Sequence, residues 1–141
     1  GETVIIPTPA LAEVLVRVGA REAEQLVERI ARYWVLRIEP FDARAAIEVA
    51  AMTRDALARG GGKGSGATTW AKLKYDRQIV AVAKVNRATV IYSDDDDVRR
   101  IAARADIEVV GVADLPLPAS NADQRTPESV RPTQISWLDG E

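Results

Sequence analysis

Histidine and cysteine are both absent from this chain of 141 residues. The lack of cysteine excludes a disulfide framework, a thiol nucleophile and a thiolate zinc site. The lack of histidine excludes a Ser-His-Asp triad and the commonest zinc ligands. Any catalytic acid, base or metal ligand must therefore come from carboxylates, lysine, tyrosine, hydroxyl groups or the backbone. Oxygen-ligand sites for Mg²⁺ or Mn²⁺ remain open.

The chain also lacks long hydrophobic runs and a strong charge of one sign. No stretch approaches the roughly 18 consecutive apolar residues of a membrane span. The 19 basic and 21 acidic residues leave a formal net charge of −2. We therefore expect a cytoplasmic protein with no membrane contact and no strong non-specific attraction to nucleic acid. A length of 141 residues predicts one domain with its own core.

Short apolar runs alternate with segments of helical periodicity. Strands are expected at residues 3–6, 34–38, 89–92 and 108–110, and helices at residues 9–18, 21–33, 43–59, 69–86 and 98–104. Thr8 is the expected N-cap of the first helix, with Pro9 as its first residue, and Asp42 is the expected N-cap of the third. Strands that alternate with helices predict parallel pairing, so we expect an α/β fold, a three-layer sandwich with a parallel sheet flanked by helices.

The periodic pattern ends near Pro118, which predicts a domain at residues 1–118 and a tail at residues 119–141. The tail is polar, and four of the seven prolines lie from Pro116 onward. Its only strong apolar residues are Trp137 and Leu138. A tail of this composition is expected to be disordered or draped over the domain.

Glycine is concentrated in one segment, since five of the nine glycines lie between Gly60 and Gly66. Backbone amides next to Lys63 are reminiscent of a phosphate-binding loop. However, Lys63 is followed by Gly64 and not by Ser or Thr, and the segment follows an expected helix and not a strand. We therefore predict a solvated connector, with contact between Lys63 and a polyanion as the remaining alternative.

Asp76 lies inside the apolar stripe of its expected helix. Leu73, Ile79 and Val80 are three or four residues away from it and so lie on the same helix face. An unpaired charge in that place is costly, so the carboxylate needs a cation. The residues alone leave two alternatives open, a bound metal ion or a buried salt bridge with Lys or Arg.

The acidic run 94–97 follows a hydrophobic strand and opens the next helix, where α/β sheets place their ligands. Helix capping accounts for one or two of these acids. Four adjacent carboxylates repel one another, and a divalent cation is the simplest partner for them. Glu13 lies near the same edge of the sheet, but Arg17 places it toward the polar side of its helix. Periodicity alone predicts that Glu13 is simply solvated.

Taken together, three segments resemble the PIN-domain family of metal-dependent ribonucleases, namely Ile6–Leu15, Lys74–Ala83 and Val90–Val98. The resemblance extends over about residues 4–118, and residues 107–110 and 115–118 lie where such domains end. It implies that the catalytic acids, which are also metal ligands, are Glu13, Asp76 and Asp95. It further implies that Asp97 is a more variable fourth ligand and that Ser93 is the neighbouring hydroxyl. Asp94 and Asp96 match no required position.

The resemblance also implies a chemistry and partners. One or two Mg²⁺ or Mn²⁺ ions held by these carboxylates would hydrolyse RNA phosphodiesters without a protein nucleophile. Cations that are candidates to guide the RNA backbone, unless they are merely solvated, are Lys72, Lys74 and Arg77. Small PIN proteins are commonly toxins that an antitoxin protein neutralises, and many are homodimers. An RNA substrate, an antitoxin and a second copy of the chain are therefore the implied partners.

One feature departs from the family pattern. PIN domains begin with a central strand that carries the first metal-binding acid, and this chain opens after the place of that strand. We expect the chain to be a fragment, with a strand from another chain or a degenerate site as alternatives. The competing functional class is a non-catalytic PIN-like module that binds RNA or protein. A phosphatase or receiver-type domain fits less well, because residues 94–97 do not follow a first strand.

Overall fold

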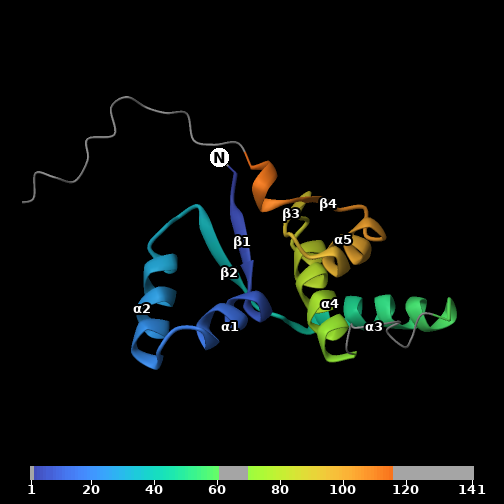
Figure 1. The fold of residues 1–141 in the computed structure, drawn as a ribbon, viewed down its shortest axis with the longest axis horizontal. Coiled ribbons are helices and arrows are strands. Elements are labelled where there is room, and N and C mark those ends of the chain that lie inside the picture. The colour runs from blue at the N-terminus through green and yellow to red at the C-terminus, as the bar shows by residue number, and fades with distance from the viewer. Residues whose placement is uncertain (1, 61–69, 116–141) are drawn as a thin grey trace, which may run out of the picture.

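The computed structural model of the protein describes residues 2–60 and 70–115 (Figure 1). In chain order, the elements in these ranges are β1 (Val4–Pro7), α1 (Thr8–Val16), α2 (Ala20–Ala31), β2 (Leu36–Glu39), α3 (Ala43–Ala58), α4 (Trp70–Val85), β3 (Val90–Tyr92), α5 (Asp96–Ala103), β4 (Glu108–Val110) and the 3₁₀ turn η1 (Val112–Asp114). Helices and strands follow the predicted order, and the predicted α/β class is confirmed.

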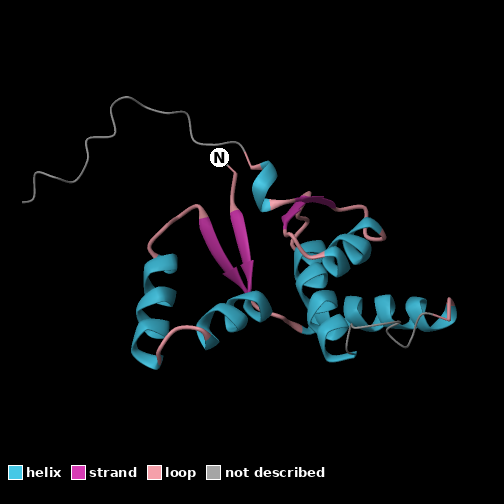
Figure 2. Ribbon diagram, in the orientation of Figure 1, coloured by secondary structure: helices cyan, strands magenta, loops and turns pink. Residues whose placement is uncertain are grey.

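The strands pair in parallel, as the sequence predicts, but they form two separate pairs (Figure 2). In the first pair, Ile5 of β1 lies opposite Arg37 of β2. In the second pair, Ile91 of β3 lies opposite Val109 of β4. Within residues 2–60 and 70–115, no strand joins the two pairs into the continuous sheet that we expected. Helix packing, and that of α4 above all, therefore connects them.

Helix α4 lies at the centre of the fold and packs against both α3 and α5 (Figure 1). Its side chains Val80 and Val82 are fully buried. Val80 belongs to a hydrophobic cluster with Ile91 of β3, and Val82 to another with Ala45 of α3 and the partly buried Ile5 of β1. Each buried valine contributes on the order of 2 kcal/mol to stability. The position of α4 is thus determined by a core on each side of it.

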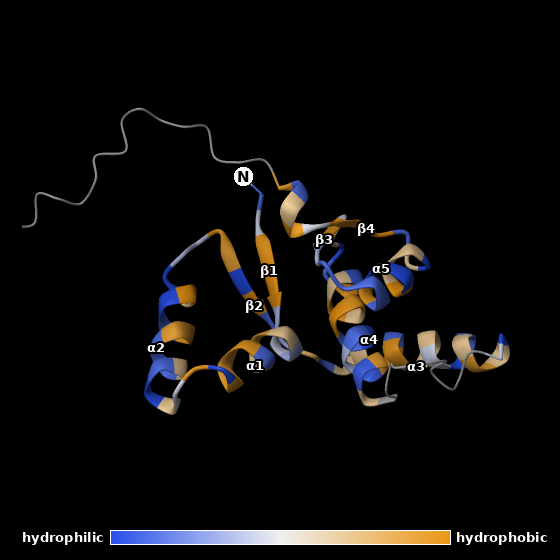
Figure 3. Cartoon of the chain, viewed as in Figure 1, coloured by the Kyte–Doolittle hydropathy of each residue, from blue (hydrophilic) through white to orange (hydrophobic). Residues whose placement is uncertain are grey.

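Helix α2 is amphipathic and packs against β2. Figure 3 shows hydrophobic and hydrophilic bands alternating along α2, and hydrophobic colour along β1. Leu26, Val27 and Ile30 are half-buried, whereas the charged residues between them are exposed, and α2 packs against β2. This is the behaviour of an amphipathic helix on the surface of a fold.

The prediction that Thr8 caps the first helix is wrong. Pro7 is the N-cap residue of α1, and Thr8 and Pro9 are its first two residues. The Thr8 hydroxyl instead accepts a hydrogen bond of 3.0 Å from the backbone N–H of Phe41, 33 residues further along the chain. A tertiary contact has therefore replaced the local cap, and it ties the segment before α3 to the start of α1.

Replacing Thr8 by Val removes the acceptor for the Phe41 N–H. We expect the free energy of unfolding to fall by about 1 kcal/mol, because a partly buried donor is left without its partner. Thr8→Ser keeps the hydroxyl and should retain most of the stability. Urea denaturation followed by circular dichroism measures both variants. Equal stabilities for the two would contradict the role assigned to the hydroxyl.

Asp42 is the N-cap of α3, as predicted. Its side chain accepts a hydrogen bond of 2.9 Å from the backbone N–H of Ala45. This hydrogen bond, together with a second one from Arg44, lowers the pKa of the Asp42 carboxyl below its usual value. The cap therefore works at neutral pH and is lost only in acid, when the carboxylate is protonated.

Several sequence predictions concern residues outside the described ranges. They include most of the glycine segment 60–66 with Lys63, the first residue of the helix expected at residues 69–86, and the tail 119–141. Among the residues that are described, no helix is long and apolar enough to cross a membrane.

Candidate metal centre

The acidic run after β3 is held in place by hydrogen bonds. The Ser93 N–H donates to the carbonyl of Val110 on the neighbouring strand at 3.0 Å, and the Ser93 hydroxyl accepts from the Asp95 N–H at 3.1 Å. Asp95 is the N-cap of α5, and its Oδ1 accepts from the N–H groups of Asp97 at 2.8 Å and Val98 at 3.4 Å. One oxygen of Asp95 therefore caps the helix, and Oδ2 remains for another partner.

Asp76 of α4 lies opposite this helix start. Asp76, Asp95 and Asp97 each offer one carboxylate oxygen, and these three oxygens all lie within 4.8 Å of one another. Asp76 and Asp97 are each only 6% exposed, and Asp95 is partly buried. The structure thus brings together three of the four acids named as ligands, from two helices that pack against each other. We call these three residues the carboxylate cluster.

Lys72 provides a positive charge inside the carboxylate cluster. Its ammonium lies 2.8 Å from Asp95 Oδ2, 2.8 Å from Asp97 Oδ2 and 3.3 Å from Asp76 Oδ2. Hydrogen bonding, first of all to Asp95, raises the pKa of Lys72. Arg100 of α5 also forms an ion pair with Asp97. The salt bridge that we considered for Asp76 is therefore present, with Asp76 buried and Lys72 partly exposed, and it belongs to a larger network.

Burial dominates the electrostatics of Asp76. Removal from water raises the pKa of its carboxyl, and the negative charges of Asp95 and Glu13 raise it further, while Lys72 acts in the opposite direction. A carboxyl group with a raised pKa is less stable in its charged form than it would be in water. The ionised form of Asp76 therefore carries a free-energy cost, and a cation of higher charge than Lys72 would reduce this cost.

This cost predicts the effect of Asp76→Asn on the metal-free protein. Because the pKa of Asp76 is higher in the folded than in the unfolded state, the folded protein binds the proton more tightly. At pH values above the pKa of the folded state, the ionised Asp76 carboxylate therefore lowers the free energy of unfolding. This loss of stability disappears as the pH falls toward 3.8, the ordinary pKa of the group. We expect Asp76→Asn to raise the melting temperature by a few degrees near neutral pH, and this gain to shrink in acid.

Thermal denaturation in the presence of a chelator, repeated from neutral pH down to about pH 4, measures this difference. Groups other than residue 76 titrate in both proteins, so only the difference between the two curves is used. A variant that melts well below the parent protein at neutral pH would show that the ionised carboxylate stabilises the fold.

Glu13 lies outside the carboxylate cluster but close to it. It is exposed on α1, which packs against α4. Its charge is near enough to raise the pKa of Asp76, yet its oxygens are not among those within 4.8 Å of one another. The structure thus places Glu13 at the margin of the site.

The remaining acids of the run and the other candidate cations have separate positions. Asp94 accepts a hydrogen bond of 2.8 Å from the Val112 N–H and so anchors η1, and Asp96 is exposed in the first turn of α5. Lys74 is exposed on α4, whereas Arg77 is only 6% exposed. Of the three cations named for the RNA backbone, Lys72 pairs with the carboxylate cluster, Arg77 is buried, and Lys74 faces solvent.

Sequence reasoning missed the role of Lys72 at this site. The available signal was its spacing, because Lys72 precedes Asp76 by four residues and such residues are neighbours on a helix. Its contacts with Asp95 and Asp97 join segments more than twenty residues apart, and no local pattern reveals them.

Comparison with known proteins adds one finding. A family model described as PIN domain matches residues 1–104, that is, 104 of the 141 residues. The matched range contains Glu13 and the whole carboxylate cluster. No curated protein and no solved structure matches the chain.

Proposed function

The chain belongs to the PIN domain family, whose members are generally nucleases, and from this premise we propose that it is a divalent-metal-dependent ribonuclease that hydrolyses RNA phosphodiesters. The observation that carries the proposal is the carboxylate cluster, with its three oxygens within 4.8 Å of one another. In this proposal Asp76, Asp95 and Asp97 are metal ligands, and Glu13 completes the acidic site.

The donor set suits Mg²⁺ or Mn²⁺. These ions prefer oxygen ligands, and carboxylate oxygens make up the whole cluster. Bonds of about 2.0–2.1 Å to Mg²⁺ allow two ligand oxygens to be at most about 4 Å apart, so an upper limit of 4.8 Å requires only small movements of the carboxylates. The ammonium of Lys72, which lies 2.8 Å from Asp95 Oδ2 and from Asp97 Oδ2, would have to move away from them.

The charge of the site also suits a divalent cation. Asp76, Asp95, Asp97 and Glu13 carry four negative charges, and Lys72 and Arg100 carry two positive ones, which leaves a formal charge of −2. A divalent cation would neutralise this excess. It would also offset the desolvation cost at Asp76, which the ammonium of Lys72 offsets only in part.

Each acidic residue has a definite task in this proposal. Asp95 is oriented through its cap and through Ser93, so that its Oδ2 faces the cluster. Asp76 brings a buried negative charge from α4, and Asp97 brings a second one from α5. Bound divalent ions supply activation of water and stabilisation of the leaving oxygen. The protein's residues provide binding and orientation, and none has to act as a nucleophile.

RNA as the substrate, a toxin role, an antitoxin partner and a homodimer remain predictions from the family resemblance. Of the three cations named for the RNA backbone, Lys74 is exposed on α4 and is not among the residues that pair with the carboxylate cluster. Phosphate contacts of this kind position a nucleic acid without reading its sequence. We therefore expect weak sequence preference from this residue.

A cleavage assay on labelled RNA tests the proposal. The full chain is incubated with RNA in the presence of Mn²⁺ or Mg²⁺, and a parallel sample contains excess chelator. Cleavage that requires the ion supports the ribonuclease. Cleavage that persists in chelator, or RNA binding without cleavage at saturating Mn²⁺, would reject it.

The second candidate function is a non-catalytic PIN-like module. The observation in its favour is Lys72, whose ammonium contacts all three carboxylates and offsets part of their negative charge. Acids that are paired in this way can serve a structural role alone. RNA binding with equal affinity in Mn²⁺ and in chelator, without cleavage, is the result that this candidate predicts.

A further inference from the structure

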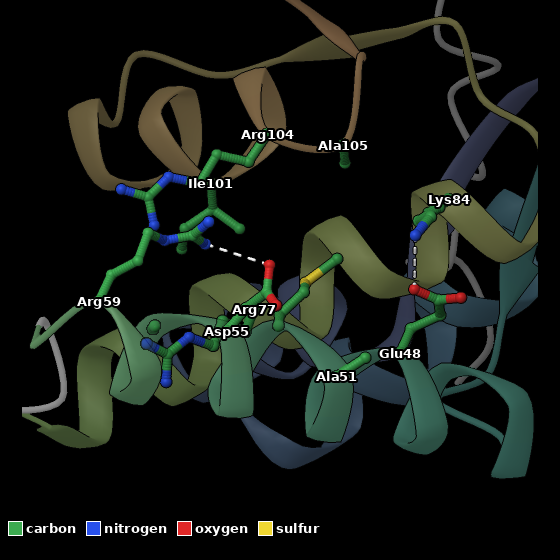
Figure 4. A pocket seen from close by; sticks show the side chains of 11 residues that line it. Glu48, Ala51, Asp55, Arg59, Arg77, Lys84, Ile101, Arg104 and Ala105 are labelled. Carbon is green, nitrogen blue, oxygen red and sulfur yellow. Dashed lines mark hydrogen bonds and ion pairs between the residues drawn. The ribbon is translucent and has the colours of Figure 1, made fainter.

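Within residues 2–60 and 70–115, helix α3 packs mainly against α4. Ala45 of α3 is fully buried in the hydrophobic cluster that the two helices share. Next to this cluster, Met52 and Ala56 of α3 line a pocket of about 190 Å³ together with Arg77 of α4 and Ile101 of α5 (Figure 4). One side of α3 is therefore covered by the core and by this pocket.

The opposite side of α3 is apolar and exposed to solvent. Ile47 is 67% exposed and Leu57 is 55% exposed. Four exposed alanines and one exposed arginine lie on the same side, at intervals of three or four residues from them or from one another, namely Ala43, Ala46, Ala50, Ala58 and Arg54. We call these seven residues the outer face of α3.

The outer face of α3 differs from the outward side of α2, where most exposed residues are charged. Single exposed apolar residues are normal on a protein surface. On α3, however, they follow one another along a helix of 16 residues, which is about 24 Å long. A helix with apolar surface on opposite sides is expected to be covered on both. The pattern therefore predicts that another surface packs on the outer face.

Two opposite charges border the outer face on the same flank. Arg44 and Asp55 are eleven residues apart, about three helical turns, so their side chains project in nearly the same direction. Their side chains are 67% and 71% exposed, and they pair with Asp42 at 3.1 Å and with Arg59 at 3.2 Å. Exposed pairs of this kind contribute little to stability. Both residues can therefore exchange these partners for others.

We propose that the outer face of α3 binds the outer face of α3 in a second copy of this chain, with the two helices antiparallel. Arg44 lies near the start of this face and Asp55 near its end, so the charge pattern is complementary to itself when the helix is turned end to end. A two-fold axis at the level of Ala50 brings Arg44 of one copy opposite Asp55 of the other, and the symmetry repeats the pair.

The composition of the outer face suits such a pairing. Its alanines allow two helices to approach closely, and Ile47 and Leu57 are removed from water. The aliphatic part of Arg54 can pack in the interface while its guanidinium reaches the rim. The inference rests on α3 itself and is independent of the proposed nuclease activity.

Analytical ultracentrifugation of the full chain measures the dissociation constant of the dimer, with chelator present so that no metal ion links two copies. We expect Ile47→Asp to raise this constant by about a hundredfold or more, because each dimer would bury two additional carboxylates. Val16→Asp is the matched control, since Val16 is 85% exposed at the end of α1 and lies outside the outer face. Both positions are exposed, so both variants should fold.

A parent chain that remains a monomer would overturn the proposal and leave the outer face to a different protein. Equal dissociation constants for Ile47→Asp and Val16→Asp would also overturn it, because the dimer would then form through another surface.

Charge reversal at low salt tests the antiparallel arrangement. Arg44→Glu or Asp55→Arg alone places like charges opposite each other twice in each dimer, and either should raise the dissociation constant about tenfold. The double variant Arg44→Glu/Asp55→Arg restores opposite charges and should bind nearly as tightly as the parent chain. A double variant that binds no more tightly than the single ones would overturn the antiparallel pairing.

Discussion

Asp76→Asn is expected to reduce metal-dependent RNA cleavage by about a thousandfold or more. The buried carboxylate of Asp76 supplies one of the three oxygens of the carboxylate cluster, and an amide has no negative charge with which to hold a divalent ion. Metal ions contribute several kcal/mol to transition-state stabilisation, and each 1.4 kcal/mol or so is about tenfold in rate. Initial cleavage rates at saturating Mn²⁺ measure the effect.

The control for this experiment comes from the same acidic run. Asp96 is exposed in the first turn of α5 and is not part of the carboxylate cluster, so Asp96→Asn should keep most of the activity. The inactive Asp76→Asn protein should remain folded, because loss of a costly buried charge does not weaken the metal-free fold. Activity above about a tenth of the parent value in Asp76→Asn would argue against Asp76 as an essential ligand.

Lys72→Met is expected to destabilise the metal-free protein and to strengthen its binding of Mn²⁺. Without metal, three carboxylates lose their shared ammonium, and the free energy of unfolding should fall by about 1–3 kcal/mol. This range lies below the cost of breaking a fully buried ion pair because the Lys72 side chain is 44% exposed. With Mn²⁺ present the loss should be recovered, and Mn²⁺ should bind about tenfold more tightly because no ammonium competes for the same oxygens.

Urea denaturation with chelator and with Mn²⁺, together with calorimetric titration of Mn²⁺, tests both parts. Lys74→Met is the matched control, since Lys74 is exposed on the same helix. If Lys72→Met and Lys74→Met have equal stabilities in chelator and bind Mn²⁺ equally, the ammonium of Lys72 does not occupy the space of the ion. Weaker Mn²⁺ binding in Lys72→Met would give the lysine an assisting role in place of a competing one.

Local sequence patterns predicted the elements and the central acid well. The apolar stripe around Asp76 indicated a buried carboxylate, and the structure places it there. Asp42 caps α3 as predicted, because an N-cap depends on residues within one turn. The order of helices and strands follows from hydrophobic periodicity in the same way.

Contacts between distant segments could not be predicted. Thr8 is bonded to Phe41 instead of capping its own helix, and Lys72 reaches Asp95 and Asp97. Arg77 was expected to face the RNA, yet it lies in a pocket with a residue of α5. Hydrogen bonding and charge pairing across the fold decided each of these positions, and side-chain types along one segment carry no information about them.

Two adjacent charges on α4 have a consequence for the uniqueness of the fold. Asp76 and Arg77 are both buried, next to each other in sequence, and they meet different surroundings. The buried residues that follow them, residues 80–83, are only valine and alanine. A rotation by one residue, about 100°, would move the carboxylate away from Lys72 and the guanidinium out of its pocket. The charges thus act together with the two hydrophobic cores in favouring one rotational setting of α4.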